Sequence, residues 1–265
     1  MYGLFLILAA FAAWLMCKAL SKIKKGFNYS DNDISSVYLI AICGAVAGSY
    51  LLRPVIRLVG VVLFWERYNI TSVIEFFNYL FGEIVFYGGF LGGLIAAYLF
   101  CRKYKIKIIP LFDLFAPPLA LGHAIGRIGC FFGGCCYGIE MPHGHPLAVI
   151  YPPVSLGAPS GISLLAVPLI EAAFLLILSL LLTVIFLKSK HFGISSSTYL
   201  LAYPIGRFTL EFFRGDIIRG NYGFLTTSQF ISIGIFIFGV LYIMRIKRNG
   251  VRHGKNIMKK ARPFG

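Results

Sequence analysis

Arg127 and Arg207 each follow a glycine inside a long and otherwise apolar stretch of the sequence. A guanidinium group keeps its proton in proteins and presents a planar fork of donors that suits phosphate. An ionised side chain is costly within membrane hydrocarbon, so such an arginine marks a candidate functional site. With few acidic residues nearby in the sequence, the two arginines predict a binding site for an anion. In a bilayer the abundant anion is a phospholipid headgroup.

A structural ion pair is the alternative for each arginine. Glu211 follows Arg207 by four residues, so the two side chains would share a helix face. Arg214 would extend this pair into a triad. The only acid expected on the helix of Arg127 is Asp113, about four turns away. The sequence leaves both interpretations open.

Two further side chains could take part in chemistry beside these arginines. His123 precedes Arg127 by one helical turn, so both would project from one face. A neutral imidazole there could act as a base, or it could be a hydrogen-bonded interior histidine. Tyr87 precedes Gly88 and Gly89, and its hydroxyl could orient a headgroup. The alternative for Tyr87 is a place in the aromatic belt at the membrane interface.

Three of the six cysteines, Cys130, Cys135 and Cys136, lie close together in the sequence. Two of them would form a disulfide in an oxidising compartment. A nearby arginine would stabilise a reactive thiolate. A metal site needs about four ligands, which His143 and His145 would have to complete. We rank a structural or disulfide role first, a reactive thiol second and a metal site third, and we predict no metal.

The amino-acid composition indicates whether these residues lie in water or in a membrane. The chain has 265 residues, of which 58% are hydrophobic and 13% are charged, whereas a soluble domain has about 25% charged residues. The net charge of +15 alone would suggest nucleic-acid binding. The lysines and arginines, however, stand in short clusters between long apolar runs, which is typical of a membrane protein. We therefore expect membrane lipids and no nucleic acid as partners.

The apolar runs predict about seven transmembrane helices, because one span needs about 20 apolar residues. The predicted helices cover residues 2–20, 37–65, 84–100, 111–132, 162–187, 199–213 and 224–244. A short amphipathic stretch, 70–80, is predicted to lie on the membrane surface. The first run has no basic segment before it, so we expect a retained helix and not a cleaved signal peptide.

Basic residues gather after the first, third and fifth predicted helices and in the tail. Cytoplasmic segments carry this excess, so we expect the N-terminus outside and the C-terminus in the cytoplasm. The chain would form one transmembrane domain, 1–244, followed by a basic cytoplasmic tail, 245–265. The expected fold class is an all-α polytopic membrane protein whose helices surround a lipid-accessible cavity.

Glycines recur four residues apart, among them Gly44 and Gly48, and Gly88 and Gly92. This spacing makes a smooth helix face, so we expect most of these glycines to serve close helix packing. The glycines of segment 122–138 are denser than packing requires. They predict some unwound backbone lining a polar cavity, where irregular backbone is tolerated at membrane depth.

Several of these motifs together resemble the phosphatidylglycerol–prolipoprotein diacylglyceryl transferase family. The similar segments are 86–92, 113–117, 126–131 and 203–214, with Gly138 following the third. They stand in the family's order on a frame of seven predicted helices, and the resemblance extends over roughly 37–244. The pattern Gly-Arg-Ile-Gly and the pattern Arg-x-x-x-Glu-Phe-Phe-Arg are specific in combination.

The resemblance implies a transferase of the bacterial cytoplasmic (inner) membrane. Such an enzyme moves a diacylglyceryl group from phosphatidylglycerol to the lipobox cysteine of a prolipoprotein and releases glycerol 1-phosphate. No cofactor and no metal are implied. Arg127 and Arg207 would bind the headgroup phosphate and stabilise the charge of the leaving group. Glu211 would brace Arg207, and the segment Gly88–Gly89 would let lipid approach the backbone.

The site residues predicted in this way fall into two groups. The catalytic group is Arg127, Arg207, His123 and Tyr87. The substrate-binding group is Gly88, Gly89, Tyr203, Glu211, Arg214 and Cys130.

The sequence departs from the family pattern at several positions. Tyr87 stands where the family usually has histidine, Cys130 where it has asparagine, and Cys135 where an acid is usual. The segment 166–171 keeps only Leu169 and Glu171 of a longer motif. Two other functions therefore stay open: a divergent paralogue with another acceptor, and a non-enzymatic lipid-binding or transport protein. A transporter would be expected to show internal repeat symmetry, and the hydropathy shows none.

Overall fold

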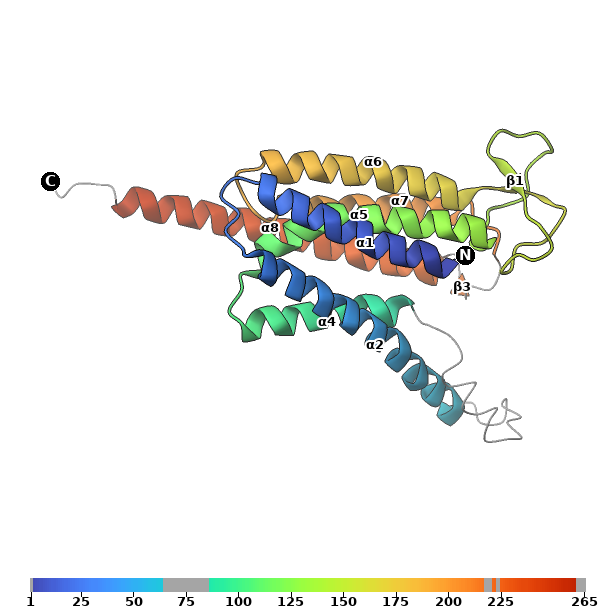
Figure 1. Ribbon diagram of the computed structural model, residues 1–265, viewed down its shortest axis with the longest axis horizontal. Coiled ribbons are helices and arrows are strands. Elements are labelled where there is room, and N and C mark those ends of the chain that lie inside the picture. Colours follow the sequence, from blue (N-terminus) through green and yellow to red (C-terminus); the bar gives the residue numbers. More distant parts are fainter. Residues whose placement is uncertain (1, 64–85, 217–220, 223–224, 261–265) are drawn as a thin grey trace. The chain divides into compact units, whose positions relative to one another are not determined.

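The computed structural model describes residues 2–63, 86–216, 221–222 and 225–260. This part of the chain contains seven helices and four short strands (Figure 1). The helices are α1 (Tyr2–Ile23), α2 (Asp31–Leu63), α4 (Phe86–Lys103), α5 (Ile108–Gly133), α6 (Val167–Lys188), α7 (Ile194–Glu211) and α8 (Thr227–Lys260). Strands β1 (Ala148–Ile150) and β2 (Ser163–Leu165) form one antiparallel hairpin, and β3 (Asn221–Tyr222) and β4 (Leu225–Thr226) form another.

Five of the described helices contain a segment long and apolar enough to cross a membrane. These segments are Tyr2–Ile23, Asp31–Leu52, Ile108–Gly133, Val167–Lys188 and Thr227–Arg248. The protein is therefore a mostly helical, polytopic membrane protein. α4 and α7 lie at the predicted spans 84–100 and 199–213 but are not among the five. The count of seven spans thus stays a prediction, and the predicted surface stretch 70–80 lies outside the described residues.

The predicted start of the helix at residue 162 is wrong. Residues 163–165 instead form β2, which pairs with β1 in antiparallel register. α6 begins at Val167 with Pro168 in its first turn. Proline is favoured there, because the first N–H groups of a helix have no partner within the helix.

The start of α7 also differs from the prediction. The helix begins at Ile194 and not at residue 199. Asp113 of α5 caps this earlier start, because its carboxylate accepts hydrogen bonds from the backbone N–H groups of Gly193 and Ser196 at 2.6 and 2.8 Å. The Ser196 hydroxyl donates a third bond at 2.6 Å. The serine-rich first turn has low hydropathy, so the apolar pattern missed it.

The chain divides into two compact units, Asn28–Ile108 and a second one formed by Met1–Phe27 with Ile109–Gly265. In the unit Asn28–Ile108, α2 packs against α4 through their glycines. A Cβ added to Gly48 would meet the backbone of Gly88 and Gly92, and one added to Gly44 would meet Gly92. The prediction that these glycines serve close helix packing is confirmed.

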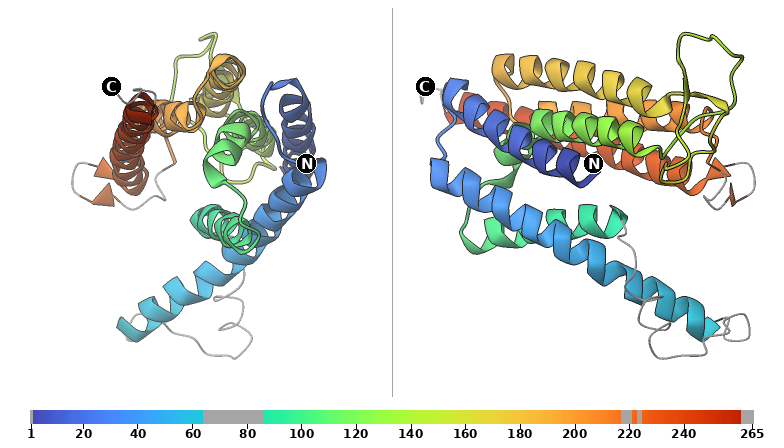
Figure 2. Two further views of the ribbon diagram at one scale, coloured as in Figure 1. Left: turned by 90° about the vertical axis from the view of Figure 1, so that its left-hand side faces the viewer. Right: turned by 45° about the vertical axis from the view of Figure 1, so that its right-hand side comes forward.

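The other unit contains α1, α5, α6, α7 and α8, which run side by side (Figures 1 and 2). α5 and α6 meet in a core of Ala116, Ala120, Leu178 and Leu182, against which Tyr203 packs. The predicted boundary at residue 244 falls inside α8, which runs to Lys260. The division into a transmembrane domain and a tail stays a prediction.

The glycine-rich part of α5 bears on another expectation. The backbone is helical from Ile108 to Gly133, so the irregular part of segment 122–138 begins only at Gly134. A Cβ on Gly129 would meet Phe5, and one on Gly122 would meet Ala9, so these glycines let α1 approach α5. The helix ends where Gly134 takes a φ of +66°.

A small hydrogen-bonded cap covers one end of this helical bundle. The backbone N–H of Gly138 donates to Leu165 at 2.9 Å, and that of Ile139 donates to Phe213 at 3.0 Å. The N–H of Gly215 donates to the carbonyl of Tyr137 at 3.1 Å. The segment after α5 is thereby attached to both β2 and the residues that follow α7.

Candidate active site

Glu171 lies at the centre of the candidate site. Its side chain, in the first turns of α6, is 1% exposed. The Nε of Arg127, from α5, lies 3.1 Å from Oε1, and an Nη of Arg207, from α7, lies 3.9 Å from Oε2. The two predicted arginines therefore converge on the two oxygens of one carboxylate.

His123 lies in the same group. Its Nε2 accepts a hydrogen bond from the Nε of Arg127 at 3.3 Å and is 3.9 Å from Oε1 of Glu171. The imidazole also lies against the ring of Tyr203, with 5.2 Å between ring centroids. The nitrogen that would act as a base is thus occupied by the arginine, so the geometry favours a positioning role for His123.

Arg207 is held from two further sides. Its Nη2 is 2.6 Å from a carboxylate oxygen of Glu211 and donates to the hydroxyl of Ser228 at 3.0 Å. Glu211 in turn accepts a hydrogen bond from the hydroxyl of Thr226 at 3.0 Å. The pairing of Arg207 with Glu211 that the four-residue spacing predicts is present.

The first turn of α8 supports this arrangement. The N–H of Thr226 donates to the side chain of Gln229 at 3.0 Å, and the N–H of Gln229 donates back to the Thr226 hydroxyl at 3.3 Å. This is a capping box, which satisfies N–H groups that have no partner within the helix. Thr226, the residue that caps the start of α8, therefore also holds Glu211 in place.

Two expectations about charge pairing are wrong, the lack of acids beside the arginines and the triad with Arg214. The arginines do not lack acids, because Glu171 and Glu211 lie beside them. Asp113, the acid expected on the helix of Arg127, caps α7. Arg214 does not complete a triad with Arg207 and Glu211. Its guanidinium instead makes two bonds to Asp216, at 2.8 and 2.6 Å. Helix packing brings Glu171 to both arginines, whereas Glu211 and Asp216 are close to their arginines in sequence.

Both arginines keep donors that these contacts do not use. Among the described residues, the hydrogen bond of Arg127 to His123 and its close ion pair with Glu171 both involve its Nε. Its side chain is 14% exposed, and no described residue accepts a hydrogen bond from its two terminal nitrogens. The Nη1 of Arg207 is buried and makes no hydrogen bond to any described residue. The pair therefore presents guanidinium donors that are fixed in place but unsatisfied.

Sequence reasoning missed Glu171 as a site residue. The sequence marks Glu171 only as a remnant of a family motif. The signal was present, because Glu171 is an acid in a long apolar run, and the rule that marked the arginines applies equally to an acid.

The remaining predicted residues are placed as follows. Gly88 and Gly89 lie on α4 in the unit Asn28–Ile108, where Gly88 packs against Gly48. The side chain of Tyr87 lies outside the described residues. Tyr203 stacks on Tyr199 with 5.5 Å between ring centroids. Their roles in substrate binding or catalysis stay predictions.

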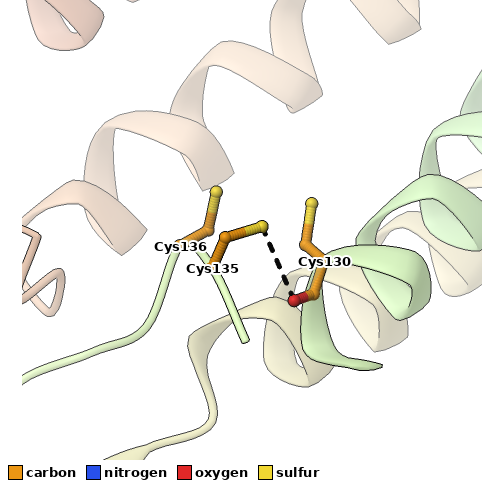
Figure 3. Close-up of side chains that lie close together, drawn as sticks. All are labelled: Cys130, Cys135 and Cys136. Carbon is orange, nitrogen blue, oxygen red and sulfur yellow. Dashed lines mark hydrogen bonds between the residues drawn. The ribbon is translucent and has the colours of Figure 1, made fainter. Parts of the chain in front are cut away.

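Cys130, Cys135 and Cys136 come together where α5 ends (Figure 3). Their Sγ atoms all lie within 4.8 Å of one another. None of the six cysteines, all of which are described, forms a disulfide. His143 and His145 are not part of the cluster.

The cluster is electrostatically uneven. Hydrogen bonds from Cys130 and Cys135, and then the positive charges of Arg214 and Arg127, hold the pKa of the Cys136 thiol far below its ordinary value. The pKa of Cys135 is raised, first by its hydrogen-bonded neighbours Cys130 and Cys136 and then by burial.

Comparison with known proteins agrees with the motifs. The profile of the family described as prolipoprotein diacylglyceryl transferase matches residues 1–245. The chain belongs to this family. The resemblance inferred from the motifs is confirmed.

Relatives within the prolipoprotein diacylglyceryl transferase family match along most of their length. The phosphatidylglycerol–prolipoprotein diacylglyceryl transferase of Clostridium tetani is 35% identical over 244 residues, which are 90% of this chain and 92% of that protein. The enzyme named phosphatidylglycerol–prolipoprotein diacylglyceryl transferase 2 of Clostridium perfringens is 34% identical over 229 residues, or 86% and 85%. That of Gloeobacter violaceus is 31% identical over 257 residues, or 95% and 90%.

Proposed function

We propose that this protein transfers a diacylglyceryl group from phosphatidylglycerol to the lipobox cysteine of a prolipoprotein, with release of glycerol 1-phosphate. The names of its relatives describe this activity. The observation that carries the proposal is the convergence of Arg127 and Arg207 on Glu171, with guanidinium donors left over on both arginines.

The unused donors would bind the phosphodiester of the lipid. Transfer breaks the bond between the glyceryl carbon and the phosphate oxygen, so a singly charged diester becomes a phosphate monoester with more negative charge. A guanidinium group stays protonated throughout. Fixed cations at this place stabilise the charge that develops in the transition state more than that of the bound lipid, which is the condition for catalysis.

The carboxylates would position the arginines. Glu171 joins α5 to α7 through its two oxygens, and Glu211 holds Arg207 in a 2.6 Å contact. The contact between Arg207 and Glu171 is long, at 3.9 Å. A phosphate oxygen would therefore compete only with the weak contact between Arg207 and Glu171. It would also accept hydrogen bonds from the two terminal nitrogens of Arg127.

The membrane topology belongs to the same proposal. The basic clusters support seven spans in the bacterial cytoplasmic (inner) membrane, with the N-terminus outside and the basic tail 245–265 in the cytoplasm. Gly129 of α5 packs against Phe5 and Tyr2, near the N-terminus. The cap after α5 would then face outward, where an exported prolipoprotein emerges.

Complementation tests this function. The chain is expressed in bacteria depleted of their own prolipoprotein diacylglyceryl transferase, and lipidation of a prolipoprotein is followed by incorporation of labelled fatty acid. We expect rescue by the native chain and by Arg102→Ala, an exposed arginine in the unit Asn28–Ile108. Arg127→Ala and Arg207→Ala should insert at equal levels but give no rescue. A native chain that inserts without rescuing growth or lipidation would contradict the proposal.

The departures from the family pattern favour one second candidate, transfer from the same lipid to another acceptor. Tyr87 and Cys130 replace the histidine and the asparagine usual in the family, so the acceptor side of the reaction differs more than the phosphate side. Release of glycerol 1-phosphate by purified protein, without lipidation of a lipobox peptide, would support this candidate.

A further inference from the structure

The thiol cluster is not used by the phosphate chemistry above. It combines Cys130 from the last turn of α5 with Cys135 and Cys136 from the segment that follows. Figure 3 shows the three side chains converging from these two directions. The backbone of Cys136 adopts a φ of +61°, a value that residues other than glycine rarely take. The backbone thus holds an uncommon conformation at the point that brings the third sulfur to the other two.

The spacing of the sulfurs fits metal coordination. Three thiolates bound to one Zn²⁺ at about 2.3 Å lie about 4 Å from one another. The three Sγ atoms already lie within 4.8 Å of one another. Side-chain rotations that move each sulfur atom by less than about 1 Å would bring the three sulfurs to this spacing. Among the described residues, no fourth Cys, His, Asp or Glu joins the group.

Two arginines lie near the thiols, and each is also paired with a carboxylate. Arg127 precedes Cys130 by three residues on α5, so the two project from neighbouring positions of one face. Arg214 pairs through its backbone with Gly138, two residues beyond Cys136. A cluster of soft sulfur donors suits a thiophilic cation better than a hard one such as Mg²⁺.

We propose that Cys130, Cys135 and Cys136 bind one Zn²⁺ ion and leave a fourth position open for the acceptor thiol. This inference rests on the proposed function for its chemistry, though not for the metal site itself. It departs from the sequence-based expectation of no metal. That expectation assumed about four protein ligands, whereas a reactive zinc site uses three and keeps one position open.

The open position would provide a way to deprotonate the acceptor thiol. The acceptor is a thiol, and the nucleophile is its thiolate. A Zn²⁺ ion held by the three thiolates would let the acceptor thiol lose its proton to water, so no protein base would be needed at Tyr87, where the family usually has histidine. The acceptor thiolate would then attack the glyceryl carbon. A C–S bond forms, the C–O bond breaks, and its electron pair leaves with the phosphate of glycerol 1-phosphate beside Arg127.

Metal binding is tested on the full-length protein purified in detergent. The protein is reduced, stripped with a chelator, equilibrated with Zn²⁺ and analysed for bound metal. We expect about one zinc per chain, as in a mononuclear site, and loss of most of it in Cys130→Ser and Cys136→Ser. Cys43→Ser, which changes an exposed cysteine outside the cluster, should keep the native metal content.

Cd²⁺ provides a readout that needs no variant. The native chain titrated with Cd²⁺ should show the ultraviolet band of thiolate-to-metal charge transfer and reach saturation at about one equivalent. Absence of this band from the reduced chain, with no zinc retained, overturns the metal site. This result would be expected if the thiols serve only to form a disulfide, which mass spectrometry of the unreduced chain would reveal.

A transfer assay separates the metal site from the reaction. If transfer to a lipobox peptide falls at least tenfold in the stripped protein and returns with Zn²⁺, the open position is supported. If the metal binds but stripping leaves transfer unchanged, the role for the acceptor thiol is overturned. A protein that binds Zn²⁺ but transfers to no acceptor removes the proposed function and leaves the metal site standing.

Discussion

At the scale of single residues, the candidate site is a chain of alternating charges. Arg127, Glu171, Arg207 and Glu211 follow one another through contacts of 3.1, 3.9 and 2.6 Å. A buried carboxylate between two cations fixes their separation, and removal of one member of such a group leaves uncompensated charge. Each side chain therefore acts through its neighbours, and substitutions should be compared within the group.

Glu171→Gln tests the central carboxylate. The amide keeps the shape of the side chain but removes its charge, so the two arginines repel each other and lose their fixed spacing. We expect transfer to fall by about 100-fold, corresponding to about 2.7 kcal/mol in the transition state. The lipidation rate of purified protein measures the effect. Glu140→Gln, at an exposed acid of the cap, should change the rate little. Equal rates for the two variants would remove Glu171 from the site.

His123 can be tested by a pair of substitutions. Glutamine can replace the acceptor that His123 offers to the Nε of Arg127, whereas alanine cannot. A positioning role predicts that His123→Gln keeps activity within about threefold, while His123→Ala loses about tenfold, the value of one hydrogen bond to a charged group. A general base predicts that both variants lose activity equally and that the pH–rate profile loses a limb. Transfer rates across pH distinguish the two roles.

At the scale of elements, the capped starts of two helices fix the positions of site residues. α7 carries Arg207, and its first turn is fixed by Asp113 of α5. α8 carries Ser228, and its capping box also holds Glu211. The motif that begins with Asp113 is therefore explained by structure: it sets the start of α7 and so the position of Arg207 along the bundle.

Asp113→Ala should destabilise the protein. The carboxylate accepts three hydrogen bonds and is 2% exposed, so its loss leaves buried N–H groups unpaired. We expect a loss of about 3 kcal/mol, seen as a lower thermal unfolding midpoint in detergent. Asp33→Ala, at an exposed helix start, should lower stability by about 1 kcal/mol or less. Similar midpoints for the two variants would contradict the capping role.

The glycine contact between α2 and α4 gives a second prediction at this scale. In Gly48→Leu, the new side chain would meet the backbone of Gly88 and Gly92, so the two helices must separate. We expect a lower unfolding midpoint and faster proteolysis within the unit Asn28–Ile108. The same change at Gly3, where an added Cβ meets nothing within 4 Å, should have little effect. Equal stability of the two variants would show that the contact is dispensable.

At the scale of the whole molecule, the orientation in the membrane decides which substrates can reach the cap. A phosphatase reporter that is active only outside the cytoplasm tests it. We expect activity when the reporter follows Gly144 in the cap, and none when it follows Lys190 after α6, because positive loops stay inside. The opposite pattern of reporter activity would invert the topology and place the thiol cluster in the cytoplasm.

The sequence by itself determined that the protein lies in a membrane, that it is mostly helical and that it belongs to this family. Long apolar runs and basic clusters are local properties, and lipid acts on each segment separately, so both can be read without knowing how the helices pack. The pairing of Arg207 with Glu211 was also predictable, because residues four apart on one helix must meet.

Only the tertiary structure decided the remaining contacts. Glu171 reaches Arg127 and Arg207 because three helices pack together, and Asp113 meets α7 and not Arg127 for the same reason. The segment after α5 turns back to bring Cys135 and Cys136 to Cys130. A buried charge or thiol takes the partner that helix packing places beside it, and that packing depends on many side chains at once, which sequence spacing does not encode.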